Sequence, residues 1–267
     1  MIRFIKNSIV RLRLIFFYIF NPKFLTGFFP ILFDYIIRGS QKKYFRNLSY
    51  SICKANSISI NEAFKIITGE EDYEFFSEIF KEEIFEAKKR VLDKGDNKGF
   101  NLDSAADLDL LYAIIKKLRI KNVLETGVAS GWSSLAMLLA QEKIKGSKLI
   151  SIDMPFYNYK NPRNLVGLAV PERLKRNWIL LREADRIGIP KAFRYNYDFG
   201  LVHYDSDKTY YGRKWAIEFI WERLKKDSLL IIDDIGDNMH YHDFIKLKRK
   251  KPIILMSNKK YVGIIKK

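Results

Sequence analysis

Short apolar runs alternate with helical stretches through the second half of the 267-residue chain, and this rhythm constrains the fold more than any other feature. It begins near residue 101 with a helix expected over 104–118, capped by Asp103 or Ser104. Short connections between such elements favour a parallel sheet with helices on both faces. The elements expected after that helix are strands at 123–124, 148–152, 178–181, 199–204 and 228–232, with helices at 133–142 and 211–224.

The C-terminal end follows another pattern. Two apolar runs, 252–256 and 261–265, flank the polar segment 257–260. This arrangement predicts an antiparallel hairpin. Residues 101–267 are therefore expected to form an α/β domain whose mostly parallel sheet is closed by a terminal antiparallel hairpin.

Residues 1–100 read as a separate, basic and aromatic helical region. Helices are expected within 60–93, one of them capped by Asn61, and the glycines of 94–100 suggest a linker. Residues 1–49 hold nine Lys or Arg and one acid, and residues 241–267 have the same balance, within a total formal charge of +17. Two basic ends on a nearly neutral body favour an anionic partner, a membrane or a nucleic acid, or serve solubility alone.

The apolar segments 14–20 and 24–37 are too short to span a bilayer, because Pro22, Pro30 and Asp34 interrupt them. No signal-peptide cleavage site follows them. Two readings stay open: a segment lying in an anionic membrane interface, or a helical subdomain that packs its aromatic side chains on the main body. The single cysteine, Cys53, excludes a disulfide framework and a Cys-rich zinc site, and it fits a reducing compartment.

A glycine-containing loop follows the first expected strand. The strand ends at Glu125, Gly127 and Gly131 permit a tight turn, and a helix with free N–H groups begins near Ser133. The next strand ends at Asp153, where an acid suits a ribose diol. The spacing is neither that of the dinucleotide fingerprint nor that of a P-loop. The loop and Asp153 together predict a nucleoside-bearing ligand.

Carboxylates follow the fourth and fifth strands. Asp205 comes after 199–204, and Asp233 and Asp234 come after 228–232. Because the carboxyl ends of parallel strands meet at one edge, we expect the three acids to converge beside the loop. Oxygen ligands favour Mg²⁺, Mn²⁺ or Ca²⁺, with Mg²⁺ as our first expectation. His203 is expected to pack, whereas His240 and His242 could reach an acceptor.

Over residues 101–267 this pattern resembles the class I S-adenosylmethionine-dependent methyltransferases. The resemblance implies a Rossmann-like, seven-stranded, mostly parallel sheet. It also implies an S-adenosylmethionine site. Glu125 and the glycine loop would surround the amino acid end of the cofactor, and Asp153 would bind its ribose. Met154, Ala184 and Asp185 would lie near the adenine. The implied cofactor residues are Glu125, Gly127, Gly131, Ser133, Asp153, Met154, Ala184 and Asp185.

The second motif is similar to that of metal-dependent O-methyltransferases of the catechol and caffeoyl type. Asp205, Lys208 and Asp233 match their spacing. Asp234 departs from their usual Asn and looks like the macrolide-sugar and glycan-pathway enzymes instead. The resemblance implies metal ligands at Asp205, Asp233 and Asp234, and catalytic roles for Asp205 and for Lys208 as proton acceptor.

These observations predict a cytoplasmic O-methyltransferase that uses S-adenosylmethionine and a divalent cation. Peripheral attachment to the inner face of the membrane stays open. The expected acceptor is a hydroxyl of a sugar, a glycan or another small molecule. RNA methylation and a non-catalytic ligand-binding or membrane-binding module are the alternatives. Base or amide N-methylation is disfavoured because the Asn/Asp-Pro-Pro-Tyr/Phe motif is absent after the fourth strand. The oligomeric state stays open, with a homo-oligomer as one outcome.

Overall fold

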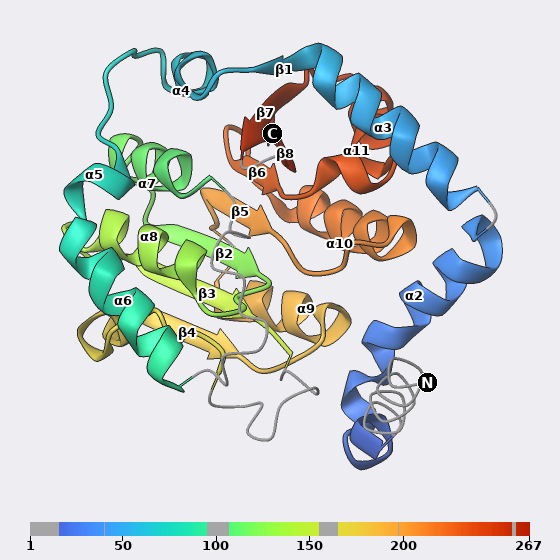
Figure 1. The fold of residues 1–267 in the computed structure, drawn as a ribbon, viewed down its shortest axis with the longest axis horizontal. Coiled ribbons are helices and arrows are strands. Elements are labelled where there is room, and N and C mark those ends of the chain that lie inside the picture. Colours follow the sequence, from blue (N-terminus) through green and yellow to red (C-terminus); the bar gives the residue numbers. More distant parts are fainter. Residues whose placement is uncertain (1–15, 40, 95–106, 155–164, 197, 258–259) are drawn as a thin grey trace.

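The computed structural model describes residues 16–39, 41–94, 107–154, 165–196, 198–257 and 260–267 (Figure 1). Three of the features expected from sequence lie outside these ranges. They are the basic residues at positions 3–13, the proposed helix caps Asp103 and Ser104, and the linker beyond Lys94.

One mixed sheet forms the centre of the molecule (Figure 1). Its strands run in the order β1-β7-β8-β6-β5-β2-β3-β4, and β8 is antiparallel to both of its neighbours, whereas the other pairs are parallel. The strands are β1 (Ser57–Ile58), β2 (Asn122–Thr126), β3 (Lys148–Ile152), β4 (Trp178–Leu181), β5 (Leu201–Tyr204), β6 (Leu229–Ile232), β7 (Ile253–Ser257) and β8 (Lys260–Lys266).

The seven strands and the terminal hairpin expected from sequence are confirmed. The two-residue strand β1 adds an eighth, unexpected member, which comes from the N-terminal region and pairs with β7. The parallel strands β2, β3, β5 and β6 point their carboxyl ends to one edge, and the loops at that edge hold the residues discussed below.

Helices cover both faces of the sheet (Figure 1). They are α2 (Leu25–Arg38), α3 (Lys42–Asn56), α4 (Ile60–Thr68), α5 (Phe76–Ile79), α6 (Lys81–Lys94), α7 (Leu108–Lys117), α8 (Trp132–Gln141), α9 (Asp185–Tyr195), α10 (Tyr210–Arg223) and α11 (His240–Lys248), with short 3-10 helices η1 (Pro22–Phe24), η3 (Glu172–Asn177) and η4 (Ile235–Asp237).

The expected cap of one helix is wrong, and the expected cap of another lies outside the described residues. Helix α7 begins at Leu108, because the side chain of Asp107 accepts a hydrogen bond from the backbone N–H of Leu110 (3.0 Å) and so caps the helix. Helix α4 is capped by Ser59 rather than by Asn61, since Ser59 and Glu62 form a reciprocal capping box.

The N-terminal helices share the core of the sheet. Phe64, Phe76 and Val91 are buried in the same cluster as residues of α7 and α8 on one face of the sheet. On the other face, Cys53 of α3 packs in the cluster formed by α9, α10 and α11. The division at residue 100 stays a prediction of sequence alone, because the helices on its N-terminal side pack directly on the sheet.

Helix α2 lies along one edge of the molecule, between η1 and α3 (Figure 1). It continues through Pro30, which the sequence analysis took as an interruption. Pro30 and Asp34 are its two buried residues. No helix among the described residues is long and apolar enough to cross a bilayer, in agreement with the sequence analysis.

Candidate active site

The loop after β2 requires glycine at two positions. Gly127 has φ = +80° and Gly131 has φ = +94°, values that side-chain-bearing residues rarely adopt. A Cβ atom on Gly127 would lie 2.5 Å from the carbonyl oxygen of Asp205. The loops after β2 and β5 therefore touch through backbone atoms, which brings the two motifs of the sequence together.

Glu125 is completely buried beneath this loop. Its carboxylate accepts hydrogen bonds from the hydroxyls of Ser133 (2.5 Å), Ser134 (2.6 Å) and Ser151 (2.6 Å). Burial raises the pKa of Glu125 to about 7, although the three serines act in the opposite direction. Glu125 and Ser133 thus fasten the start of α8 to the sheet, and their contact with a cofactor stays a prediction.

Asp153 extends from the end of β3 toward the same loop. Its Oδ2 accepts the backbone N–H groups of Val128 (3.0 Å) and Ala129 (2.8 Å). Burial raises the pKa of Asp153, against the effect of these hydrogen bonds. The carboxylate therefore shapes the loop and also borders the space beside it.

That space is a cavity of ≈ 750 Å³ at the carboxyl edge of the sheet. This volume is in the range of small-molecule and cofactor sites. Six residues expected from sequence line it: Gly127, Asp153, Met154, Asp185, Asp205 and Lys208. The other expected cofactor residues, Glu125, Gly131, Ser133 and Ala184, are buried behind its wall.

Asp185 begins α9 on the far side of the cavity. Its carboxylate accepts hydrogen bonds from the hydroxyls of Tyr204 (3.1 Å) and Ser206 (2.6 Å). Burial raises the pKa of Asp185 to about 6. Ser206 also contacts the Thr126 hydroxyl at 3.0 Å, so the loops after β2, β4 and β5 are connected through one hydrogen-bonded group.

Helix α2 supplies a wall of the cavity that the sequence analysis missed. Thr26, Gly27 and Phe28 line it. A Cβ atom on Gly27 would lie 3.3 Å from the sulfur of Met154, so the glycine lets the helix approach closely. The one available signal was a glycine within an otherwise bulky aromatic stretch, and it does not say what the glycine contacts.

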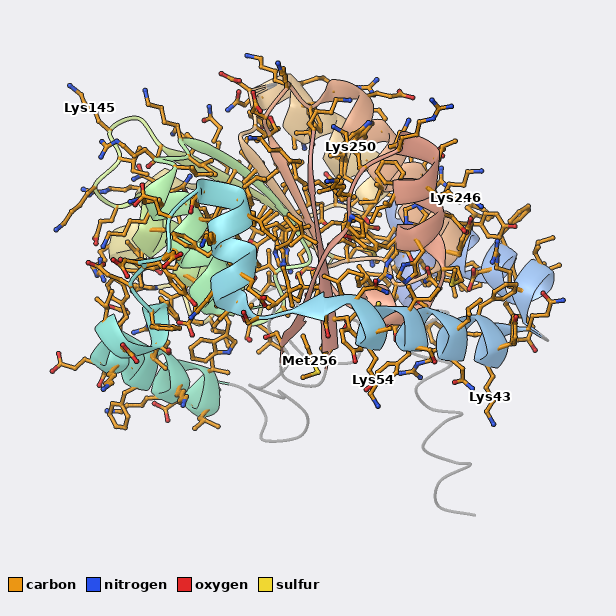
Figure 2. All side chains as sticks on the ribbon, turned by 90° about the horizontal axis from the view of Figure 1, so that it is seen from above. Lys43, Lys54, Lys145, Lys246, Lys250 and Met256 are labelled. Atoms are coloured by element: carbon orange, nitrogen blue, oxygen red, sulfur yellow. The ribbon has the colours of Figure 1, made fainter. Side chains whose placement is uncertain are left out.

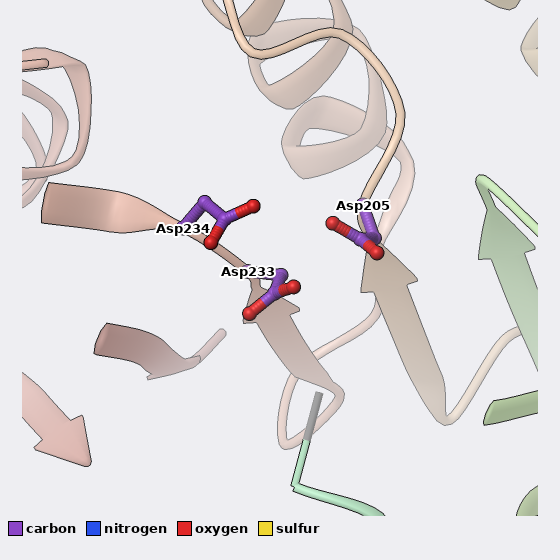
Figure 3. Close-up of side chains that lie close together, drawn as sticks. All are labelled: Asp205, Asp233 and Asp234. Atoms are coloured by element: carbon purple, nitrogen blue, oxygen red, sulfur yellow. The ribbon is translucent and has the colours of Figure 1, made fainter. Parts of the chain in front are cut away.

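The acids after β5 and β6 converge as expected. Each of Asp205, Asp233 and Asp234 offers a carboxylate oxygen, and these atoms lie within 4.8 Å of one another (Figure 3). Asp233 is 1% exposed, and neither of its carboxylate oxygens has a hydrogen-bond partner among the described residues. A buried, unsatisfied carboxylate in such a group fits a cation.

Lys208 projects into this acidic group. Its ammonium forms ion pairs with Asp205 and with Asp234 (2.9 Å), and it lies 4.0 Å from Asp233. Lys260 from β8 also contacts Asp234, at 3.2 Å. Burial lowers the pKa of Lys208, while Asp233 and Asp234 act to raise it.

Arg213 of α10 fixes the turn that carries the two adjacent acids. Its guanidinium is buried and donates to the carbonyl oxygens of Asp233 (2.9 Å) and Asp234 (3.0 Å). Asp234 adopts φ = +51°, which turns its side chain toward Lys208. Asn238 donates to the carbonyl of Lys208 (2.9 Å) and so connects the two loops.

The three histidines lie in packed surroundings. Burial lowers the pKa of His203 to about 4 and that of His240 to about 3, so both rings are neutral near pH 7. The ring of His240 contacts Tyr210, and His242 lies 3.0 Å from the Ser49 hydroxyl of α3. None of the three lines the cofactor-sized cavity.

Residues 124–235 match the model of a family described as a methyltransferase domain. This stretch contains the glycine loop, Asp153 and the acidic group. A search of curated proteins found no significant match to the sequence.

Solved methyltransferases share the fold at low sequence identity. An O-methyltransferase from Bacillus cereus, in complex with SAH, is 11% identical, with 80% of this chain and 100% of that chain covered and a TM-score of 0.55. The SAH-bound methyltransferase PaMTH1 from Podospora anserina is 13% identical over 85% and 96% of the two chains, with a TM-score of 0.52. A methyltransferase from Geobacter sulfurreducens is 16% identical over 68% and 88%, with a TM-score of 0.51. The chain therefore shares the fold of these solved methyltransferases, and its residues 124–235 resemble a methyltransferase domain.

Proposed function

We propose that this protein transfers the methyl group of S-adenosylmethionine to a hydroxyl of a sugar or glycan, with the assistance of a divalent cation. One observation carries the proposal. A single cavity is lined both by Gly127 and Asp153 of the expected cofactor site and by Asp205 and Lys208 of the acidic group. A cofactor in this cavity could therefore meet an acceptor hydroxyl that is held beside Asp205 and Lys208.

The cofactor end has the groups that a charged nucleoside needs. Asp153 offers a carboxylate near the expected ribose, and Met154 offers an apolar surface for a base. Asp185 and Ser206 add polar atoms on the opposite wall. S-adenosylmethionine, when bound, supplies an activated methyl group on a sulfonium sulfur.

The acidic group fits a divalent cation that prefers oxygen ligands. Asp205, Asp233 and Asp234 would hold it, and the unpartnered oxygens of Asp233 favour this assignment over a purely structural ion-pair network. A bound cation would lower the pKa of an acceptor hydroxyl and orient it. Lys208 competes for the same carboxylates, so cation binding and the position of its ammonium are expected to be coupled.

Lys208 is our candidate for the proton acceptor. In the proposed reaction the acceptor oxygen attacks the methyl carbon, a C–O bond forms and the C–S bond breaks. The hydroxyl proton passes to Lys208 Nζ in its neutral form, and the products are S-adenosylhomocysteine and a methyl ether. Burial lowers the pKa of Lys208 and thereby increases the neutral fraction.

A second cavity, of ≈ 290 Å³, is also lined by Lys208 and is the place where we expect the acceptor. Arg38, Lys42 and Arg46 line it, together with Tyr210, whose ring lies 3.6 Å from the Arg38 guanidinium carbon. Asp34, Asp237 and Asn238 line it as well, and Asp237 pairs with Arg46 at 3.5 Å. This polar lining, in which cations outnumber acids, suits a hydroxyl-rich acceptor better than a planar apolar one.

An activity assay tests the proposal. The protein is incubated with S-adenosylmethionine and a panel of glycosides and nucleotide sugars, with Mg²⁺ or with EDTA, and S-adenosylhomocysteine release is measured. We expect release with a sugar acceptor in Mg²⁺, loss in EDTA, and loss in Asp233→Asn. Asp198→Asn is the matched control, because Asp198 is exposed and pairs with Lys225 away from the cavity. If EDTA and Asp233→Asn both left S-adenosylhomocysteine release equal to that of the unaltered protein in Mg²⁺, the proposal of a divalent cation would be wrong.

A further inference from the structure

Helix α2 buries only Pro30 and Asp34, and most of its apolar residues are exposed. We call its eight exposed residues the outer face, and all of them are hydrophobic: Leu25, Phe29, Ile31, Leu32, Phe33, Tyr35, Ile36 and Ile37. Phe29 is 59% exposed, Ile36 is 65% exposed and Tyr35 is 76% exposed. A helix that covers a protein core shows the reverse pattern. From this we infer that the outer face of α2 docks on an anionic lipid surface.

The inner face of the helix explains why the arrangement is inverted. Gly27 allows a close approach to Met154, Pro30 is buried, and Asp34 accepts the backbone N–H of Tyr210 at 3.2 Å. These contacts place the helix against the protein with the narrow side that carries Gly27, Pro30 and Asp34. Apart from Phe33, whose ring contacts Tyr211 of α10, the broad apolar side is left exposed by the part of the chain that the structure describes. A patch of this kind marks an interaction site.

The dimensions favour a helix that lies in the plane of a membrane. At 14 residues, α2 is about 21 Å long, shorter than the roughly 30 Å hydrocarbon core of a bilayer. Phe16, Ile19 and Phe20, just before η1, are also more than half exposed and extend the apolar surface. Aromatic side chains such as that of Tyr35 are favoured at the boundary between lipid and water.

The charges around α2 select an anionic surface rather than a second copy of this chain. Lys42, Lys43 and Arg46 are exposed in the first turns of α3, and in Figure 2 Lys43 and Lys54 point away from the body of the protein. The single acid in residues 1–49, Asp34, is buried. Two such basic surfaces would repel each other, whereas anionic headgroups would attract both. An apolar face combined with a basic flank provides the two signals that stable membrane binding requires.

Docking would bring the cofactor cavity to the lipid surface. Ile31 is 49% exposed on the outer face and also lines that cavity. The same helix therefore forms a wall of the site and the proposed membrane contact.

Vesicle flotation of the full-length protein tests the inference. The probes are vesicles of phosphatidylcholine alone and vesicles that also contain phosphatidylglycerol, each at low and at high salt. We expect binding to the anionic vesicles that weakens at high salt, because the basic residues act through screened charges. Phe29→Glu and Ile36→Glu should each lower the partition constant about ten-fold, because burial of one large apolar side chain contributes about that factor.

Phe85→Glu is the matched control, because Phe85 is 66% exposed on α6, a different helix. It should leave vesicle binding unchanged, and all three variants should bind S-adenosylhomocysteine as the unaltered protein does, which shows that they fold. The inference would be overturned if no protein floated with anionic vesicles, or if Phe29→Glu and Phe85→Glu floated equally well. A dimer that light scattering shows to dissociate in Phe29→Glu, without vesicle binding, would assign the face to a second copy.

Discussion

Helices α8 and α2 have similar apolar compositions and opposite surroundings. All ten residues of α8 are buried, between the sheet and α7, whereas α2 buries two of its fourteen. Both helices border the cofactor side of the sheet, α8 through the loop that precedes it and α2 through Gly27. The difference lies in what each helix does with its apolar side chains: α8 uses them in the core, and α2 leaves them at the surface.

The polar residues of the two regions differ in the same way. Beneath α8, Glu125 is buried and satisfied by three serine hydroxyls, so the loop depends on a network in which each member needs the others. On α2, Asp34 makes one backbone contact to α10. We therefore expect replacement of the polar residues near α8 to reduce stability most. Replacement of the exposed apolar residues on α2 should reduce it least.

The largest effect is expected for Glu125→Ala. Loss of the carboxylate leaves three buried hydroxyls without their acceptor and opens a cavity, so the free energy of unfolding should fall by about 3–5 kcal/mol. Denaturant unfolding measures this. Glu222→Ala is the control, because Glu222 is 69% exposed and should change stability by no more than about 0.5 kcal/mol. Similar losses for the two variants would contradict the role of the network.

Glu125 also predicts a pH dependence. Its pKa rises from the ordinary value of 4.5 to about 7 in the folded protein, so the unfolded chain releases this proton first as the pH increases. The contribution of Glu125 to stability is therefore fully present below about pH 4.5 and is lost by about pH 7. Glu125→Gln lacks this titration. Between about pH 4.5 and pH 7, the free energy of unfolding of the unaltered protein should therefore fall relative to that of Glu125→Gln. A difference that stays constant with pH would show that the carboxyl does not titrate there.

Gly127→Ala should come next. The positive φ and the 2.5 Å approach of a Cβ atom to the Asp205 carbonyl force the two loops apart. We expect a loss of about 1–3 kcal/mol in stability and a loss of S-adenosylmethionine binding, measured by calorimetry. Gly146→Ala is the control that separates backbone strain from steric crowding. Gly146 also has a positive φ, but a Cβ atom there would meet no atom within 4 Å. Retained binding in Gly127→Ala would contradict the contact between the loops.

The smallest effects distinguish the two sides of α2. Asp34→Ala removes the acceptor of the Tyr210 N–H and should cost about 1 kcal/mol. Ile36→Gln, on the outer face, should change the free energy of unfolding by less than about 0.5 kcal/mol. Thermal and denaturant unfolding without lipid compares them. A larger loss for Ile36→Gln would mean that protein covers the outer face.

The sheet was the most predictable part of the molecule. Strands β3 and β4 match the expected bounds to the residue, because each is a short, mainly apolar run with clear ends. The convergence of Asp205, Asp233 and Asp234 also followed from the sequence, since parallel strands place their carboxyl ends together. Strand β1 was not predictable, because two residues carry no periodicity and their pairing with β7 is a long-range contact.

The surroundings of the predicted site residues were less accessible to sequence reasoning. Glu125 occupies the expected position at a strand end, but its engagement by three serines depends on how α8 and β3 pack. The wall formed by Gly27 joins segments more than a hundred residues apart. The ion pairs of Lys208 depend on the turn that Arg213 fixes, and no local pattern in the sequence specifies that turn.

The most direct measurement is calorimetric titration of S-adenosylmethionine into the purified protein, repeated with Asp153→Ala and with the exposed control Asp198→Ala. We predict binding with a stoichiometry near one site per chain, its loss in Asp153→Ala and its retention in Asp198→Ala. Absence of binding to the unaltered, folded protein in the presence and absence of Mg²⁺ would contradict the assignment of the cavity to this cofactor.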